Sequence, residues 1–235
     1  MVKAQHFRNL IRWPLILLGL IWAVFFVDHY LLGRELTYYY GLATRELAGT
    51  WGIVTSPLLH SGWPHLLSNS FPFLTLSGLL VFFYPRLWPR VLATLWIGTG
   101  VLVWTLGRPV VHIGASGVVY ALAAFLAFSG FFRRDVKAIV VSLIVLFYYG
   151  GMVVGILPGQ EGISWESHLL GLVMGVIGAY WYRGELEEHE IEAAEKRAAR
   201  YRPREKEPFL DLDAFEKTKE ERRAEAFWEK LRGGD

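Results

Sequence analysis

Ser116 and His168 are a serine and a histidine in two separate apolar stretches of this 235-residue chain. A serine hydroxyl becomes a nucleophile when a neighbouring imidazole accepts its proton. An arginine follows each of these apolar stretches and marks its cytoplasmic end. Ser116 lies 17 residues before Arg133, and His168 lies 15 residues before Arg183. In a third stretch, Asn69 lies 17 residues before Arg86. At about 1.5 Å per helical residue, all three share one level, roughly 5 to 8 Å below the outer surface of a membrane, where water reaches them.

Small residues would allow the helices that carry this pair to approach closely. His168, Gly171 and Gly175 recur at i, i+3 and i+7, so they share one helix face of a kind that packs backbone to backbone. Small side chains also surround the serine, at Gly114, Gly117, Ala121 and Ala124. Contact between these two faces would bring the serine and the histidine within hydrogen-bond reach.

Other polar side chains fall near the same level. His65 lies four residues before Asn69, one helical turn nearer the exterior, and Tyr120 lies four residues after Ser116, one turn deeper. Asp28 reaches a similar height, where it either faces the same cavity or lies at the water boundary. Each signal has a simpler interpretation. A serine in a membrane helix commonly forms a hydrogen bond to its own helix backbone, and a single histidine is commonly a packing residue. The shared depth and the glycine face together favour the catalytic hypothesis.

Six apolar stretches are long enough to cross a hydrocarbon core, and we expect an all-α integral membrane bundle. The third is marginal in length. They are residues 11–32, 64–84, 91–106, 109–132, 138–157 and 165–182. None carries a charge at its middle, which argues against a proton-coupled transporter, an aspartyl protease or a carboxylate-bound metal centre. The chain has no Cys, which excludes thiol chemistry, and no HExxH or Walker-type motif. We expect no cofactor.

The chain divides into a membrane domain, residues 1–183, and a charged tail, residues 184–235. The tail holds 28 of the 46 charged residues. The net charge of +2 is the sum of +6 in the membrane domain and −4 in the tail, so it gives no indication of nucleic-acid binding. Basic residues collect at the N-terminus, in the second and fourth loops and in the tail, which predicts cytoplasmic termini. A Cys-free core without a targeting presequence suits a prokaryotic plasma membrane. The first loop, of about 31 residues, is too long for a simple connector.

The tail is expected to form two helices. The first runs near residues 185–201, and the second begins with Asp213 as cap and Glu216 three residues later, and ends at Gly233. The second helix carries an apolar patch of Ala224, Phe227, Trp228 and Leu231. It is either a partner-docking or membrane-surface helix, or a solvated extension.

Three motifs resemble those of the rhomboid intramembrane serine proteases. GASGVVYAL, residues 114–122, is similar to the GxSG nucleophile motif and its following tyrosine. HLLGLVMG, residues 168–175, is similar to HxxGxxxG with the base histidine first. LLHSGWPHLLSN, residues 58–69, is similar to the stretch with a structural histidine, here His60, and an oxyanion pair. The resemblance covers about residues 10–183.

The resemblance implies a six-span bundle with a water-filled active site open to the outer face. Ser116 would be the nucleophile and His168 the base, with no acidic third member. The Ser116 N–H, His65 and Asn69 would form the oxyanion hole, and Tyr120 would stack on His168. The fifth span and residues 155–162 would form a lateral gate for substrate helices.

The sequence departs from the family pattern at three positions. Gly52 follows Trp51 where many members have arginine, Ile113 replaces a second glycine, and Pro72 follows Asn69 by three residues. The leading hypothesis is an endopeptidase that cleaves single-span membrane proteins near the outer boundary. The alternative is a non-catalytic relative that binds transmembrane helices, which would lack the dyad that this chain retains. The sequence does not indicate the oligomeric state or the physiological substrate.

Overall fold

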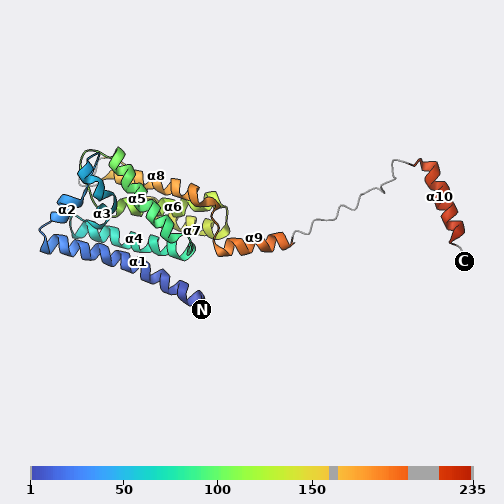
Figure 1. Ribbon diagram of the computed structural model, residues 1–235, viewed down its shortest axis with the longest axis horizontal. Helices are drawn as coiled ribbons and strands as arrows, with labels where there is room; N and C mark the ends of the chain where they lie inside the picture. The colour runs from blue at the N-terminus through green and yellow to red at the C-terminus, as the bar shows by residue number, and fades with distance from the viewer. Residues whose placement is uncertain (1, 159–163, 201–216, 234–235) are drawn as a thin grey trace. The chain divides into compact units, whose positions relative to one another are not determined.

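A computed structural model describes residues 2–158, 164–200 and 217–233. The chain forms two compact units, residues 1–191 and 192–235, which are described separately. The first unit is an all-α membrane bundle (Figure 1), in agreement with the predicted fold class. Its long helices are α1 (Val2–Phe26), α4 (Trp63–Phe83), α5 (Trp88–Leu106), α6 (Ser116–Arg133), α7 (Val136–Tyr149) and α8 (Trp165–Trp181).

Five helical segments within the described residues are long and apolar enough to cross a membrane. Two of them continue beyond an α-helix, since a π-helical turn, η1 (Val27–Leu31), extends α1 and a 3-10 helix, η4 (Gly150–Ile156), extends α7. The sixth apolar helix, α8, has 17 residues, at the lower limit for a span. All six expected stretches are thus helical in large part, and the count of six spans stays a prediction.

The predicted start of the fourth span at Pro109 is wrong, because α6 begins at Ser116. Residues 109–115 instead form a loop with the short strand β2 (Val111–His112), which pairs antiparallel with β1 (Leu42–Ala43). Gly114 then adopts a φ of 109°, which favours glycine and ends the extended segment just before the helix. The serine is therefore the first residue of its helix.

The first loop is folded, as its length predicted. It contains α2 (Glu35–Tyr40), η2 (Leu47–Trp51), α3 (Gly52–Thr55) and η3 (Ser56–Leu58). Gly52 packs so closely on β1 that an added Cβ would lie 2.2 Å from the Leu42 Cα, so only glycine fits there. This contact explains why position 52 needs glycine in this chain. Asp28 is buried and accepts hydrogen bonds from the Leu36 and Thr37 N–H groups, so it holds the start of α2.

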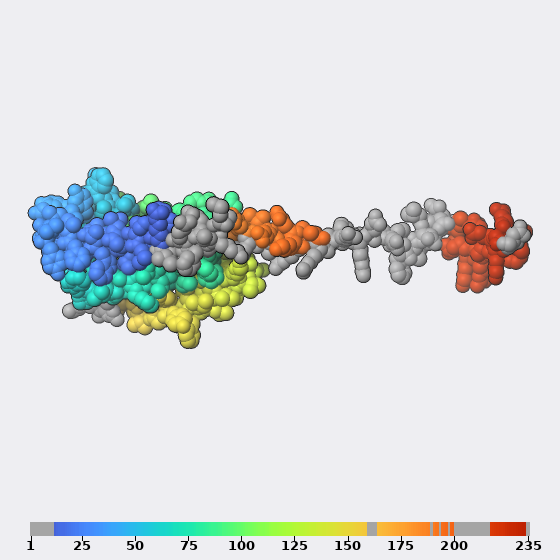
Figure 2. All heavy atoms as spheres, turned by 90° about the horizontal axis from the view of Figure 1, so that it is seen from below, coloured from blue at the N-terminus to red at the C-terminus, as the bar shows by residue number. Residues whose placement is uncertain are grey.

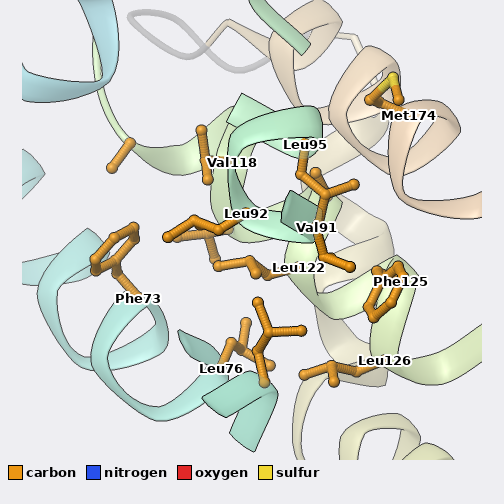
Figure 3. Close-up of a cluster of buried hydrophobic side chains, with 14 of the residues drawn as sticks. Phe73, Leu76, Val91, Leu92, Leu95, Val118, Leu122, Phe125, Leu126 and Met174 are labelled. Atoms are coloured by element: carbon orange, nitrogen blue, oxygen red, sulfur yellow. The ribbon is translucent and has the colours of Figure 1, made fainter. Parts of the chain in front are cut away.

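The core of the bundle lies where α4, α5, α6 and α8 meet. Figure 3 shows Phe73 and Leu76 of α4, Leu95 of α5, Leu122 and Phe125 of α6 among the side chains that fill it. Helix α6 is central, because it packs against α4, α5, α7 and α8. The hydrophobic positions of α6 are consequently buried nearly all round, and this helix provides the fixed platform for the serine.

The compact unit extends past the predicted domain boundary at Arg183 to Ile191. Glu187 is fully buried, and its carboxylate accepts the N–H groups of Arg86 and Leu87, each at 3.1 Å. Arg133, at the end of α6, donates to Glu190 at 2.6 Å and to the carbonyls of Tyr182 and Glu185. The first residues after the last span are therefore part of the membrane bundle.

The tail contains the two predicted helices, α9 (Glu188–Arg200) and α10 (Lys219–Arg232). The predicted cap of the second was wrong. Asp213 and Glu216 lie outside the described residues, and α10 begins after Thr218, which forms a capping box with Glu221. Gly233 follows the helix end, as predicted.

Candidate active site

The polar residues singled out by depth line one pocket of about 1180 Å³. Ser116 and Tyr120 of α6, His65 and Asn69 of α4, and His168 of α8 all contribute to its wall. Three separate helices thus place these side chains around one space, as their equal depth predicted. The pocket is also lined by Met152 and Pro158 on the side of η4.

Glycines on α6 and α8 determine how closely the serine and histidine helices approach. A Cβ added at Gly171 would lie 2.1 Å from the Gly117 carbonyl oxygen, and one added at Gly175 would lie 2.3 Å from that of Ala121. These distances are far below any real Cβ contact, so the two backbones touch. The predicted glycine face of α8 is confirmed.

His60 holds the loop that leads into Ser116. Its Nε2 accepts the Ala115 N–H at 3.4 Å, and its Nδ1 donates to the Leu58 carbonyl, also at 3.4 Å. Burial, together with the neighbouring His65, lowers the pKa of His60 to about 4. The imidazole is therefore neutral at ordinary pH and retains the lone pair that accepts the backbone N–H.

His65 lies directly against Gly114. A Cβ added at Gly114 would lie 2.4 Å from His65 Nε2, so glycine is required here for space as well as for its φ. The Ser61 N–H donates to His65 Nδ1 at 3.4 Å, which makes Nδ1 an acceptor. In the neutral ring the proton then resides on Nε2, beside the loop that precedes Ser116. This nitrogen is positioned as a donor near the serine.

Asn69 is buried, and its amide donates to the His65 carbonyl at 3.0 Å. The hydrogen bond is made within α4, one turn back along the helix. An amide nitrogen carries two hydrogens, so one remains for a partner in the pocket. Pro72, three residues later, lines the same pocket within an unbroken α4. The oxyanion roles of Asn69 and His65 stay predictions.

His168 is held on two sides. Its Nδ1 donates to the Gly155 carbonyl at 2.9 Å, which leaves Nε2 as the acceptor nitrogen. The Tyr120 ring stacks on the imidazole with centroids 4.2 Å apart and an interplanar angle of 8°. The stacking predicted from the family resemblance is therefore present. The two rings lie in one layer between α6 and α8.

No hydrogen bond joins Ser116 to His168 within the described residues. Such bonds are commonly long before substrate binds and shorten in the reacting complex. The pair shares the pocket wall, and the serine lies at the start of α6, where backbone N–H groups have no partner within the helix. The arrangement therefore suits attack on a carbonyl with stabilisation of the resulting oxyanion.

Sequence reasoning placed this segment in a lateral gate and missed the contacts of η4 with Tyr120 and His168. The Tyr120 hydroxyl donates to the Met152 carbonyl at 2.7 Å, and His168 donates to the Gly155 carbonyl. Both acceptors are main-chain groups, which no residue type reveals. The glycines at 150, 151 and 155 were the one available signal that this segment approaches other backbone or side chains closely.

His112, Ser164 and Arg108 form a second polar group on the pocket wall. His112 Nδ1 accepts from the Ser164 hydroxyl at 2.6 Å, and its Nε2 donates to the Arg108 carbonyl at 3.1 Å. Burial lowers the pKa of His112, which keeps the ring neutral. Glu166 forms an ion pair with Arg108. Among the described residues, no three metal-ligating side chains gather to hold an ion.

An apolar groove of about 690 Å³ lies beside the active-site pocket. Leu15 of α1, Leu74 and Phe82 of α4 and Ile144 of α7 line it, and Tyr149 lines both the groove and the pocket. Figure 2 shows α1, α4 and the segment that includes α7, in blue, teal and yellow, on one face of the unit. A hydrogen bond between Thr75 and Tyr149 joins α4 to α7 where the two spaces meet.

Comparisons with known proteins agree with this geometry. The family model described as Rhomboid domain matches residues 48–185. Uncharacterized proteins from Mycobacterium tuberculosis and Mycobacterium bovis are each 40% identical over 149 residues, which is 60% of this chain and 62% of theirs. One from Mycobacterium leprae is 38% identical over 139 residues, 55% of each chain. The matched part thus spans less than two thirds of the length of these curated relatives.

Proposed function

Because this chain belongs to the rhomboid family, we propose that it is an intramembrane serine endopeptidase that cleaves single-span membrane proteins near the outer membrane boundary. One observation carries the proposal: Ser116 and His168, from different helices, line one pocket together with His65 and Asn69. The Nδ1 hydrogen bond of His168 supports it, because Nε2 is left free to accept the serine proton.

In this mechanism, Ser116 Oγ attacks the scissile carbonyl carbon while His168 Nε2 takes the hydroxyl proton. The carbonyl oxygen becomes an oxyanion, which accepts hydrogen bonds from the Ser116 N–H, His65 Nε2 and the Asn69 amide. The imidazolium then gives its proton to the leaving nitrogen, and an acyl enzyme remains. Water, deprotonated by His168, releases the second product and restores the serine.

The substrate in this proposal is a transmembrane helix that enters from the bilayer. The apolar groove between α1, α4 and α7 offers it a lipid-exposed approach that ends at Tyr149, beside the catalytic pocket. A helix must unwind locally before a carbonyl reaches the serine, so small or helix-breaking residues are expected near the cleavage site.

Covalent labelling tests the proposal directly. A fluorophosphonate should label the purified full chain in detergent, and Ser116→Ala and His168→Ala should each reduce labelling and substrate cleavage to background, because the pair acts as one unit. Ser129→Ala is the matched control, since that hydroxyl lies in the same helix but bonds the Phe125 carbonyl. A folded wild type without Ser116-dependent labelling would favour the non-catalytic, helix-binding alternative.

The proposal includes cytoplasmic termini in a prokaryotic plasma membrane, with the pocket open to the outside. Its support is the distribution of Lys and Arg over the loops and tail. Reporter fusions at the C-terminus should be active in the cytoplasm, and an external C-terminus would put Ser116 on the wrong side for the stated cleavage.

A further inference from the structure

We infer that the 3-10 segment η4 completes the catalytic pair through its main chain: the Gly155 carbonyl orients the His168 imidazole, and the Met152 carbonyl holds Tyr120 against it. The inference rests on the proposed function and assigns to the main-chain carbonyls of Met152 and Gly155 a positioning role in it. The family motifs quoted above do not include these residues.

Two hydrogen bonds join η4 to the two stacked rings. His168 Nδ1 donates to the Gly155 carbonyl at 2.9 Å, and the Tyr120 hydroxyl donates to the Met152 carbonyl at 2.7 Å. The rings themselves stack at 4.2 Å. The Gly155 carbonyl therefore fixes the tautomer of His168. The Tyr120 ring fixes the plane of the imidazole, and the Met152 carbonyl holds that tyrosine in place. Both carbonyls come from one short segment.

The positioning is equivalent to that of the carboxylate in a catalytic triad. An acceptor at Nδ1 keeps the proton there, so Nε2 stays available to the serine, and the acceptor stabilises the imidazolium that forms during attack. A carbonyl has only a partial negative charge, but the His168 side chain is buried, so the carbonyl dipole acts on it at short range. The carboxylate of Glu166 does not take this role, because it pairs with Arg108.

The absence of a side chain at position 155 is what allows this contact. A Cβ added at Gly155 would lie 2.1 Å from the Tyr120 hydroxyl oxygen and 3.3 Å from His168 Nδ1. Gly155 is not among the glycines with positive φ, so its backbone conformation suits alanine and only space forbids it. A methyl group there must displace η4, the Tyr120 ring or both, and so disturb the contact. By contrast, a Cβ at Gly151 of the same segment would meet nothing within 4 Å.

Gly155→Ala and its matched control Gly151→Ala test the inference. The readouts are the rate of fluorophosphonate labelling of Ser116, which needs the dyad but no substrate helix, and kcat and KM for a single-span substrate. Gly155→Ala should slow labelling and lower kcat roughly 10- to 100-fold, by analogy with loss of the partner that orients a metal-binding histidine. Gly151→Ala should match wild type in both, and all variants should retain the thermal midpoint of a folded bundle.

A double-mutant cycle with Tyr120→Phe identifies the cause. Removing the hydroxyl eliminates the 2.1 Å clash and leaves 3.3 Å as the closest contact of the new methyl group. Gly155→Ala should therefore cost much less in the Tyr120→Phe background than in wild type. Equal costs in both backgrounds would mean that the methyl group acts elsewhere and would overturn the inference.

Two further results would also overturn it. Labelling of Gly155→Ala at the wild-type rate, with slower cleavage of the membrane substrate alone, would make η4 only a gate for the substrate helix. Labelling and cleavage equal to Gly151→Ala would remove any role for the carbonyl, while the proposed protease function would stand. A wild type without Ser116-dependent labelling would remove that function and this inference together.

Discussion

Histidines in and beside the pocket are held by hydrogen bonds to the main chain. His168 donates to a carbonyl of η4, and His60 accepts the N–H of Ala115. Two acidic residues near helix ends, Asp28 and Glu166, are engaged elsewhere, since Asp28 holds the start of α2 and Glu166 pairs with Arg108. A dyad is consistent with this distribution, because neither of these two carboxylates is free to join it.

Asn69→Ala tests the oxyanion role. The amide makes no proton transfer in the proposed mechanism, so its loss should slow turnover without changing the form of the pH dependence. One lost donor typically costs about 2.7 to 4 kcal/mol, roughly a hundred- to a thousand-fold in rate. We expect the lower end, because His65 Nε2 and the Ser116 N–H remain.

The measurement is the single-turnover rate of Asn69→Ala beside that of Ser116→Ala. The first should retain measurable cleavage and slower fluorophosphonate labelling, and the second should retain neither. A wild-type rate in Asn69→Ala would mean that the amide only satisfies the His65 carbonyl, as it does in the free protein.

His60 should make the bundle sensitive to acid. Its pKa is lowered from 6.5 to about 4 by burial and by His65, so the folded protein resists protonation that the unfolded chain accepts. The neutral His60 ring contributes fully to the free energy of unfolding above about pH 6.5. This contribution, roughly 3 kcal/mol in total, is lost as the pH falls towards 4.

The thermal midpoint in detergent, measured between pH 7.5 and pH 5, checks this expectation. His60→Gln preserves an acceptor for the Ala115 N–H and cannot be protonated, so its midpoint should fall less over the same interval. An identical fall in both proteins would assign the acid sensitivity to other groups.

The sequence predicted the side chains of this site better than their supports. Ser116, His168, His65 and Asn69 could be found because polar groups in apolar helices are few and their depth follows from helix rise. The carbonyls of Met152 and Gly155 could not, because main-chain groups have no sequence signature. Their position depends on a 3-10 segment that tertiary contacts shape.

At the scale of helices, the close approach of α6 and α8 sets the distance between serine and histidine. Gly175→Ala should therefore separate the helices, because its Cβ would lie 2.3 Å from the Ala121 carbonyl oxygen and 2.6 Å from the Ala124 Cβ. Overpacking of this kind costs about 1 to 3 kcal/mol. We expect a lower thermal midpoint and slower labelling of Ser116.

Gly19→Ala is the matched control for this change. Gly19 also lies within a membrane helix, but an added Cβ would meet nothing within 4 Å. Its midpoint and labelling rate should equal those of wild type. If Gly175→Ala behaves in the same way, the glycine face of α8 does not control the geometry of the dyad.

Helix positions were predictable, but some helix ends were not. Apolar length predicted the helices, yet α6 starts seven residues after the expected Pro109, because β2 pairs with the first loop and Gly114 turns the chain. Strand pairing of this kind joins residues 42–43 to residues 111–112. These segments are far apart in the sequence, so a local sequence pattern does not predict the pairing. The cap of α10 was also misplaced, since two capping patterns occur within a few residues.

At the scale of the whole molecule, the junction between membrane bundle and tail is stabilised by buried charge. Arg133 bonds Glu190 and two carbonyls, and Glu187 receives two loop N–H groups in a fully buried position. Burial raises the pKa of Glu187, while the two N–H groups favour its ionised form. Residues 185–190 thus tie the C-terminal ends of α4, α6 and α8 to the start of α5.

Two truncations separate this junction from the rest of the tail. Deleting residues 204–235 should leave cleavage of a detergent-solubilised substrate within a few-fold of wild type, since every proposed catalytic group precedes Arg183. Deleting residues 185–235 should lower the thermal midpoint markedly, because Arg133 loses its carboxylate partner and two loop N–H groups lose their acceptor, each loss costing about 1 to 3 kcal/mol. Cleavage and thermal midpoint are measured on both.

Loss of cleavage in the shorter deletion, with the bundle still folded, would place the second unit within the catalytic machinery. An unchanged midpoint in the longer one would show that the buried carboxylates of the junction add no net stability.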